Sequence, residues 1–154
     1  MIKLISAVAL NNVIGNKGKL LWNYPEDSKR FKELTLDSVV VMGANTFLYD
    51  LETKALPNRT NIVLSTKLNK YDYPQVTICR TGNEVLDLVN NNCWIIGGSK
   101  IYKLFLPLVQ LMEITHIHKA FDGDTYFPNI DYSNWSITNQ INNNELTYCT
   151  YVRI

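Results

Sequence analysis

The stretch "CWIIGGSKIYKLFLPL", residues 93–108, places a strand pattern and a helix pattern on either side of two glycines. The apolar run up to Ile96 is typical of a strand that is buried on both faces. Residues 99–108 predict a helix that continues up to Pro107. Gly97 and Gly98 suit the close approach of a phosphate group to the start of that helix. A tight turn that needs glycine conformations explains the pair equally well, so this motif alone does not decide the function.

The same alternation of strand and helix patterns continues on both sides of this stretch. Apolar runs predict strands at residues 2–10, 38–43, 60–65, 75–79 and 111–118, and helical patterns cover residues 25–35, 44–50 and 82–90. Residues 11–24, with Gly15 and Gly18, predict a loop. The runs 135–141 and 146–154 alternate as an antiparallel hairpin does. The predicted fold is therefore an α/β three-layer sandwich, with a mostly parallel central sheet, an antiparallel C-terminal edge and helices on both faces.

Glycines at the ends of two predicted strands indicate where a site would lie. Ligands of open parallel sheets bind beyond the carboxyl ends of the strands. Gly43 follows the run 38–42 and Gly97 follows the run 93–96, so we expect both on one rim of the sheet. Since "IIGGSKIY" is neither a Walker motif nor a GxGxxG motif, it does not specify a particular nucleotide.

The composition is that of one soluble globular domain, and we assign residues 1–154 to it. The chain is 46% hydrophobic and 19% charged, and it is long enough for a sizeable core. Its net charge of +1 predicts no strong field for nucleic acid or a membrane surface. Cys79, Cys93 and Cys149 lack CxxC spacing, which indicates reduced thiols in a cytoplasmic protein. His116 and His118 have no third ligand in register, so no metal site is predicted.

The opening run, "MIKLISAVAL", has some features of a signal peptide. It is short, however, it breaks at Asn11 and Asn12, and no convincing cleavage site follows it. We therefore interpret it as a buried first strand. No segment approaches the length that is needed to span a membrane, so no membrane partner is predicted.

The predicted helix at residues 25–35 carries a carboxylate in an unusual place. Asp27 and Phe31 are four residues apart and share a helix face, which Leu34 continues. Glu26, Lys29 and Arg30 are expected to point elsewhere. Asp27 therefore faces the same apolar interior as Phe31 in this interpretation. The alternative is an ordinary acid at a helix start, which faces solvent and complements the helix dipole.

Seven segments occur in an order and at a spacing that one known family shares. They are "NNVIG" (11–15), "LLWNYPEDSKRFKELT" (20–35), "VVVMGANTF" (39–47), "LPNRTNIVLS" (56–65), "IIGGSKIY" (95–102), "THI" (115–117) and "GDTYFP" (123–128). On these segments the chain resembles dihydrofolate reductase from end to end. The resemblance implies an eight-stranded sheet and the NADPH-dependent reduction of 7,8-dihydrofolate to 5,6,7,8-tetrahydrofolate. It also implies a role in one-carbon metabolism and in thymidylate and purine synthesis, antifolate inhibitors as ligands, and a monomer.

The resemblance places Asp27 on the family's buried active-site carboxylate. Such a group can accept both donors of the pterin edge, a ring N–H and an exocyclic amine, in a charge-assisted bidentate pair. It also promotes protonation at N5, through the substrate enol and water, while a hydride reaches C6. Thr115 would donate to Asp27, and Trp22 would close the active-site loop and hold a water. The implied catalytic residues are Asp27, Trp22, Thr115 and Leu20.

The substrate-binding residues that the resemblance implies form an apolar slot with a cation at its far end. Arg59 matches the arginine that clamps the α-carboxylate of the glutamate tail, a bidentate role that lysine fills poorly. A solvated loop arginine is the alternative. The implied set is Ile5, Ala7, Asp27, Ser28, Phe31, Leu56, Arg59, Ile96 and Thr115.

The cofactor-binding residues that the resemblance implies lie along the glycine-rich rim. The family has a cis peptide bond between the glycines that match Gly97 and Gly98. The loop around residues 15–24 would close over the nicotinamide and exclude water, supported by Gly123 and Asp124. The implied set is Ala7, Ile14, Gly15, Leu20, Gly43, Ala44, Asn45, Thr46, Leu64, Ser65, Thr66, Lys67, Ile96, Gly97, Gly98, Ser99, Lys100, Ile101, Tyr102 and Thr125.

The chain departs from the family at several positions. Ala44 and Asn45 stand where members usually carry a basic pair, the first of which helps to bind the 2′-phosphate of NADPH. Leu21 replaces the usual proline before the tryptophan, Ser28 replaces a frequent leucine, and two extra residues lie within 48–57. Because Ala44 and Asn45 carry no positive charge, we expect a smaller preference for NADPH over NADH than in members with the basic pair. The remaining candidates for contacts to the phosphate are Thr66, Lys67 and Lys100.

Two other functions are compatible with parts of the sequence. A pyrimidine reductase of riboflavin synthesis shares the sheet and the NADPH site, but it lacks the buried acid, the tail arginine and the "WNxPxD" run. A non-catalytic relic of the fold would serve as a binding or structural component. The intact Asp27, Trp22, Thr115 and Arg59 argue against such decay.

Overall fold

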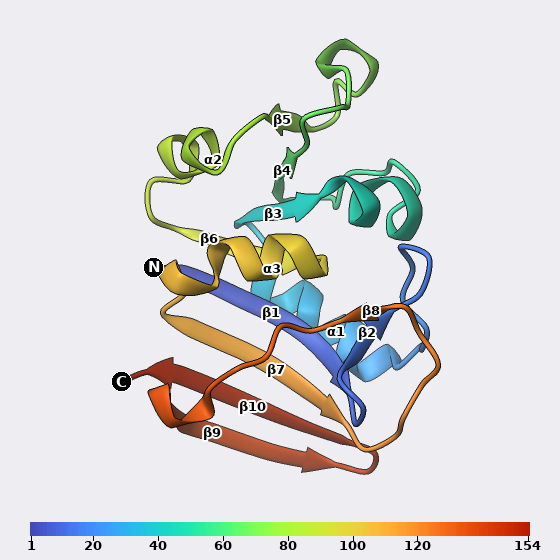
Figure 1. Ribbon diagram of the computed structural model, residues 1–154, viewed down its shortest axis with the longest axis vertical. Helices are drawn as coiled ribbons and strands as arrows, with labels where there is room; N and C mark the ends of the chain where they lie inside the picture. Colours follow the sequence, from blue (N-terminus) through green and yellow to red (C-terminus); the bar gives the residue numbers. More distant parts are fainter.

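An eight-stranded sheet forms the centre of the protein in the computed structural model, which describes all 154 residues (Figure 1). Its strand order is β5-β4-β3-β6-β1-β7-β10-β9. The strands are β1 (Ile2–Ala9), β3 (Val39–Gly43), β4 (Thr60–Leu64), β5 (Thr77–Cys79), β6 (Cys93–Gly97), β7 (Leu111–Ile117), β9 (Trp135–Asn143) and β10 (Leu146–Arg153). Within this sheet, only the β7–β10 and β10–β9 pairs are antiparallel. The predicted sheet, with its antiparallel C-terminal edge, is confirmed.

Helices cover both faces of the sheet, as predicted. The helices are α1 (Pro25–Thr35), α2 (Gly82–Val89) and α3 (Ser99–Phe105), and the short helical turns are η1 (Thr46–Asp50), η2 (Lys70–Asp72), η3 (Leu106–Leu108) and η4 (Tyr132–Asn134). Successive strand residues point to opposite faces. Leu4 of β1 accordingly belongs to a core cluster with α2 and α3, whereas Ile5 belongs to the cluster on which Phe31 of α1 packs. Figure 1 shows α3 on the near side of the sheet and α1 on the far side.

Two local predictions need correction. The segment 11–24 is not only a loop, because β2 (Val13–Gly15) pairs antiparallel with β8 (Thr125–Tyr126). A three-residue strand is too short to show a periodic pattern, so this pairing depends on a distant segment. The helix that was expected up to Pro107 ends as an α-helix at Phe105 and continues as the 3₁₀ turn η3. Proline lacks the N–H that the next α-helical hydrogen bond needs.

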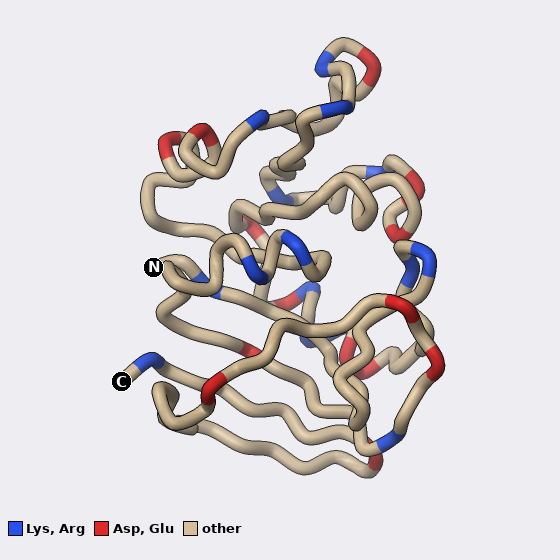
Figure 2. The backbone as a smooth tube through the Cα atoms, in the orientation of Figure 1, with Lys and Arg blue, Asp and Glu red and all other residues tan.

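The opening run forms a buried strand, as predicted. Leu4 is fully buried in β1, which lies between β6 and β7 in the sheet. The three cysteines are buried free thiols. Every helix in the structure is too short or too polar to cross a membrane. Figure 2 shows basic and acidic residues interspersed along the backbone, which matches the net charge of +1.

Candidate active site

One cavity of about 990 Å³ runs along the carboxyl ends of the parallel strands. It contains all the residues that the sequence assigned to the site, except Trp22 and Arg59. Gly43 and Gly97 both line it, because the strands that they end, β3 and β6, are parallel neighbours. The chain therefore places the expected substrate and cofactor residues on one continuous surface.

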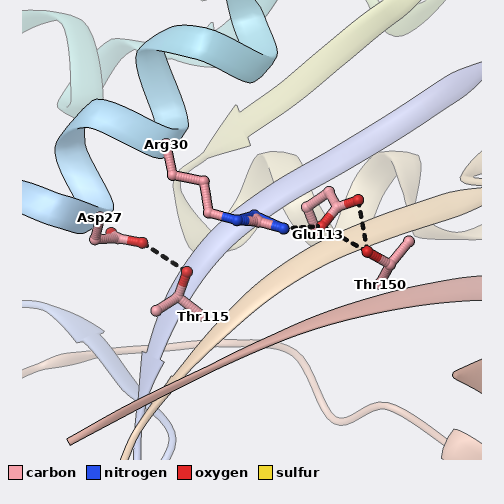
Figure 3. Close-up of polar contacts among 5 residues, drawn as sticks. All are labelled: Asp27, Arg30, Glu113, Thr115 and Thr150. Carbon is pink, nitrogen blue, oxygen red and sulfur yellow. Dashed lines mark hydrogen bonds and ion pairs between the residues drawn. The ribbon is translucent and has the colours of Figure 1, made fainter. Parts of the chain in front are cut away.

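The Asp27 carboxylate lies at the start of α1 and faces β7. The Thr115 hydroxyl donates a hydrogen bond of 2.6 Å to Asp27 Oδ1 (Figure 3). Burial raises the pKa of the Asp27 carboxyl, whereas this hydrogen bond and the nearby Arg30 charge oppose the rise. Glu26 adds to the rise through like charge. A carboxylate in this setting can bind two donors of a planar ligand and can take part in proton transfer.

The prediction that Arg30 points away from the Asp27 side was wrong. Arg30 lines the same cavity, and its Nη2 atom lies 2.8 Å from Oε2 of Glu113 on β7 (Figure 3). Its guanidinium carbon also lies 4.8 Å from the centroid of the Tyr148 ring. Arg30 is three residues from Asp27 and Phe31 is four, and both spacings make neighbours on a helix surface. Glu113, a carboxylate within a buried strand two residues before Thr115, is the sequence signal that indicates this pair.

Trp22 and Arg59 lie beside the cavity and not in its wall. Trp22 is buried against Phe121, with ring centroids 5.0 Å apart, and its indole N–H has no acceptor in the protein. Arg59 Nη1 donates to the Thr35 hydroxyl at 3.1 Å, and its Nε donates to the Pro57 carbonyl at 2.9 Å. Both side chains are thus held in place, and each keeps a donor that the protein does not use.

Gly43, Gly97 and Gly98 form a glycine rim where β3 and β6 end, and they have no side chain to cover the backbone there. A Cβ atom added at Gly43 would lie 2.8 Å from Cγ1 of Ile101, so this position excludes a side chain. The peptide bond between Gly97 and Gly98 is cis, as the resemblance implied. The Tyr102 hydroxyl donates to the Ile5 carbonyl at 2.7 Å, and burial raises the pKa of Tyr102. The tyrosine therefore stays neutral and fixes α3 against β1.

The far end of the cavity collects hydroxyls and cations. Ser65, Thr66 and Lys67 follow β4 and line it, as do Ala44 and Asn45, which follow the neighbouring strand β3. Arg80, which was not among the predicted site residues, follows β5 and lines this end. Its Nη1 atom donates to the Ser65 carbonyl at 2.9 Å. The signal was weak, because an arginine after a strand is usually a solvated loop residue. Other lining residues outside the predicted set are Ser6, Gly18, Lys19, Arg30, Asp50, Leu51, Thr81, Gly82, Leu104 and Tyr126, while Asp124 was expected only as a support of the 15–24 loop. Hydroxyls with lysine and arginine are the donors that suit phosphate groups, so this end fits a phosphorylated cofactor.

The segment that follows β2 is anchored on two sides of the cavity. The Lys17 backbone N–H lies 3.1 Å from both Asp124 carboxylate oxygens, and the Leu20 N–H donates to Asp50 Oδ1 at 3.1 Å. Asp50 is the last residue of η1. The chain thus holds Leu20, which is 48% exposed, at the cavity edge.

Comparisons with known proteins agree on one family. The family model for dihydrofolate reductase matches residues 1–153. The dihydrofolate reductase of Bacillus subtilis is 34% identical over 139 residues, which cover 89% of this chain and 81% of that protein. The Haemophilus influenzae dihydrofolate reductase is 35% identical over 136 residues, or 87% and 82% of the two chains. Among solved structures, Enterococcus faecalis dihydrofolate reductase, complexed with NADP(H) and RAB-propyl, matches at 34% identity with a TM-score of 0.89, covering 99% of this chain and 96% of its own.

Proposed function

This chain belongs to the dihydrofolate reductase family, and on that premise we infer that it reduces 7,8-dihydrofolate to 5,6,7,8-tetrahydrofolate with NADPH as the cofactor. The observation that carries the inference is Asp27, bonded to Thr115 in the wall of the large cavity beside the glycine rim. The family match favours this activity over a pyrimidine reductase of riboflavin synthesis. The intact carboxylate and rim favour it over a non-catalytic relic.

We propose that Asp27 binds and orients the pterin. Its carboxylate accepts the ring N–H and the exocyclic amine, and the Thr115 hydroxyl keeps it aimed at them. Apolar side chains at the same level form the slot and exclude water from the ring; they are Ile5, Phe31, Leu56 and Ile96. The raised pKa of Asp27 suits a group that promotes protonation at N5 near neutral pH. The free indole N–H of Trp22 is a donor for the water on that path.

We propose that the rim holds the cofactor in an extended form. NADPH supplies the hydride that is added to C6. Ala7 and Ile14 offer backbone groups at the nicotinamide end, and Gly43, Thr46 and Gly98 receive the pyrophosphate. Ser65, Thr66, Lys67 and Arg80 provide hydroxyls and charge at the adenosine end. The segment around Leu20, anchored on Asp50 and Asp124, closes the nicotinamide end against water.

We further propose that residues 1–154 act as one domain and as a monomer in the cytoplasm. The eight-stranded sheet, whose strands extend from Ile2 to Arg153, supports the first point. Three buried free thiols support a reducing compartment. The function as a whole is tested by the loss of NADPH absorbance when dihydrofolate is added. A protein that binds NADPH but reduces only a pyrimidine substrate would contradict it.

Arg59→Ala is expected to weaken dihydrofolate binding by about 1.5–3 kcal/mol, the usual cost of losing a charge-assisted pair. Two of the guanidinium's bonds hold it near Thr35 and Pro57, which leaves Nη2 for the tail carboxylate. The measurement is the dissociation constant of dihydrofolate and of a pterin that lacks the glutamate tail. The tail-less pterin should bind both proteins alike. Equal losses for the two ligands would show that Arg59 is only structural.

Ala44→Arg is expected to tighten NADPH by about 1–2 kcal/mol and to leave NADH nearly unchanged. The two cofactors differ by one 2′-phosphate, which arginine binds bidentately and alanine does not. In the parent protein Lys67 and Arg80 supply charge at this end of the cavity, so NADPH is still preferred. Because partly exposed charges are screened, the preference should shrink as salt rises.

The measurement for position 44 is the dissociation constant of each cofactor at low and at high salt. Ala44→Gln is the matched control, since it adds length without charge and should not discriminate between the cofactors. If Ala44→Arg tightened NADPH and NADH equally, position 44 would not face the 2′-phosphate.

A further inference from the structure

A buried carboxylate, Glu113, lies close to the candidate active site. It is 8% exposed on β7, and a carboxylate so placed needs partners to offset the lost hydration. Oε2 accepts a hydrogen bond of 2.8 Å from Arg30 Nη2 of α1. The Thr150 hydroxyl of β10 lies 2.8 and 2.9 Å from the two carboxylate oxygens (Figure 3). The Glu113 carboxylate therefore has hydrogen-bond partners from α1 and from β10, the two elements that contact β7 here.

This arrangement fixes the Arg30 side chain. Its guanidinium is bonded to Glu113 at one edge and lies over the Tyr148 ring, 4.8 Å from the centroid. The side chain is 23% exposed and forms part of the cavity wall. A flexible cation is thereby held at a defined position in the wall that contains Asp27.

Two polar contacts of α1 with β7 stand next to each other. Asp27 contacts Thr115, and Arg30, three residues later, contacts Glu113, two residues earlier (Figure 3). Three helical residues advance about 4.5 Å. Two strand residues advance about 6.6 Å, which long side chains can bridge, and a step forward along α1 is matched by a step backward along β7. The two polar contacts add to the packing of Phe31 and Leu34 in holding α1 on the sheet.

Besides its contact with Glu113, Arg30 acts on Asp27 through its positive charge. The ionisable groups that act on Asp27 are Glu26 and Arg30 from α1, and Tyr148 of β10 is close enough to feel the Asp27 charge. From β7, Thr115 contributes a hydroxyl and Glu113 acts through Arg30. Arg30 is the only cation in this group, and it is shared between two carboxylates.

We propose that Arg30, held by Glu113, which Thr150 also binds, is a positioning residue that fixes α1 against β7 and favours the ionised form of the Asp27 carboxylate. The proposal rests on the proposed function, because it concerns the reaction that Asp27 serves. Its charge favours the ionised carboxylate, and Glu113 limits that effect by competing for the guanidinium. The pair thus sets the pH range in which the Asp27 site works.

The test is the pH dependence of hydride transfer in single turnovers, measured for pairs of variants. Glu113→Gln keeps the shape and the contacts but frees the Arg30 charge, so the apparent pKa of the rate should fall. Arg30→Met combined with Glu113→Gln removes the cation without leaving a buried charge unpaired, so the apparent pKa of the rate should rise above that of Glu113→Gln alone. Arg30→Lys keeps the charge and should keep the parent profile with a lower rate, because the planar guanidinium that contacts Glu113 and lies over Tyr148 is lost.

The control is Lys29→Gln, which removes a positive charge next to Arg30 from a side chain that is 78% exposed. Its profile should match that of the parent protein. If the combined variant does not fold, the downward shift of Glu113→Gln tests the proposal alone. Unshifted profiles in the Glu113 variants, or an equal shift in Lys29→Gln, would overturn it. The proposed function would survive that result as long as the parent reduces dihydrofolate and Asp27→Asn impairs it.

Discussion

Asp27→Asn is expected to slow hydride transfer at neutral pH by about 10²–10⁴-fold, the range that a general acid or base usually contributes. Asparagine keeps the size of the side chain, and its amide oxygen can still accept from Thr115. It cannot ionise, so it neither promotes protonation at N5 nor pairs with both pterin donors as an acceptor. The loss should shrink at low pH, where the substrate arrives already protonated.

The measurement is the single-turnover decay of NADPH absorbance from acidic to alkaline pH. In the parent protein the rate should follow the raised pKa of Asp27, and in the variant it should follow the protonation of the substrate alone. Thr115→Val is a useful companion, because it removes the hydroxyl partner and keeps the carboxylate. A variant with the rate and pH profile of the parent would exclude Asp27 from the reaction.

The folding stability of Asp27→Asn separates lost chemistry from lost structure. Burial raises the folded-state pKa of Asp27 above its ordinary value of 3.8, so the folded protein holds this proton more tightly than the unfolded chain. The stabilising effect of that proton is fully present below pH 3.8 and is lost as pH rises through the folded-state pKa. At neutral pH the ionised group therefore gives no gain in stability. The urea midpoint of Asp27→Asn at neutral pH should equal or exceed that of the parent.

Phe47→Ala is expected to lower the free energy of unfolding by about 3–5 kcal/mol. Phe47 is fully buried in η1, within the core cluster on the α1 side of the sheet. Its ring meets Tyr73 edge-on, with centroids 5.3 Å apart at 85°. Truncation leaves a cavity that the surrounding strands cannot fill, and it also loses the aromatic contact.

The measurement for Phe47→Ala is urea unfolding, read as a lower midpoint with an unchanged slope. Tyr71→Ala is the matched control, because Tyr71 is 92% exposed and its loss should change the unfolding free energy by less than about 0.5 kcal/mol. Similar midpoints for Phe47→Ala and the parent would mean that η1 does not contribute to the core in solution.

The sequence by itself was enough for the sheet, α1 and the glycine rim, because their signals are local. Pro25 marks the helix start, apolar runs mark the strands, and Gly43 and Gly97 end neighbouring parallel strands. The predicted bounds of α1 match the structure residue for residue. The family resemblance located most of the cavity wall in the same way, since a motif keeps its residues at a constant spacing.

Contacts between segments far apart in the chain were decided only by the tertiary structure. The pairing of β2 with β8 joins Val13 to Tyr126, and neither strand is long enough to carry a period. Helix spacing placed Phe31 beside Asp27 but turned Arg30 away, because the partner that draws Arg30 inward is Glu113, 83 residues later. Arg80 likewise lies in the cavity wall because its guanidinium donates a hydrogen bond to the Ser65 carbonyl. Periodicity describes which way a backbone position faces, whereas the end of a long charged side chain goes where the folded chain provides an opposite charge or an acceptor.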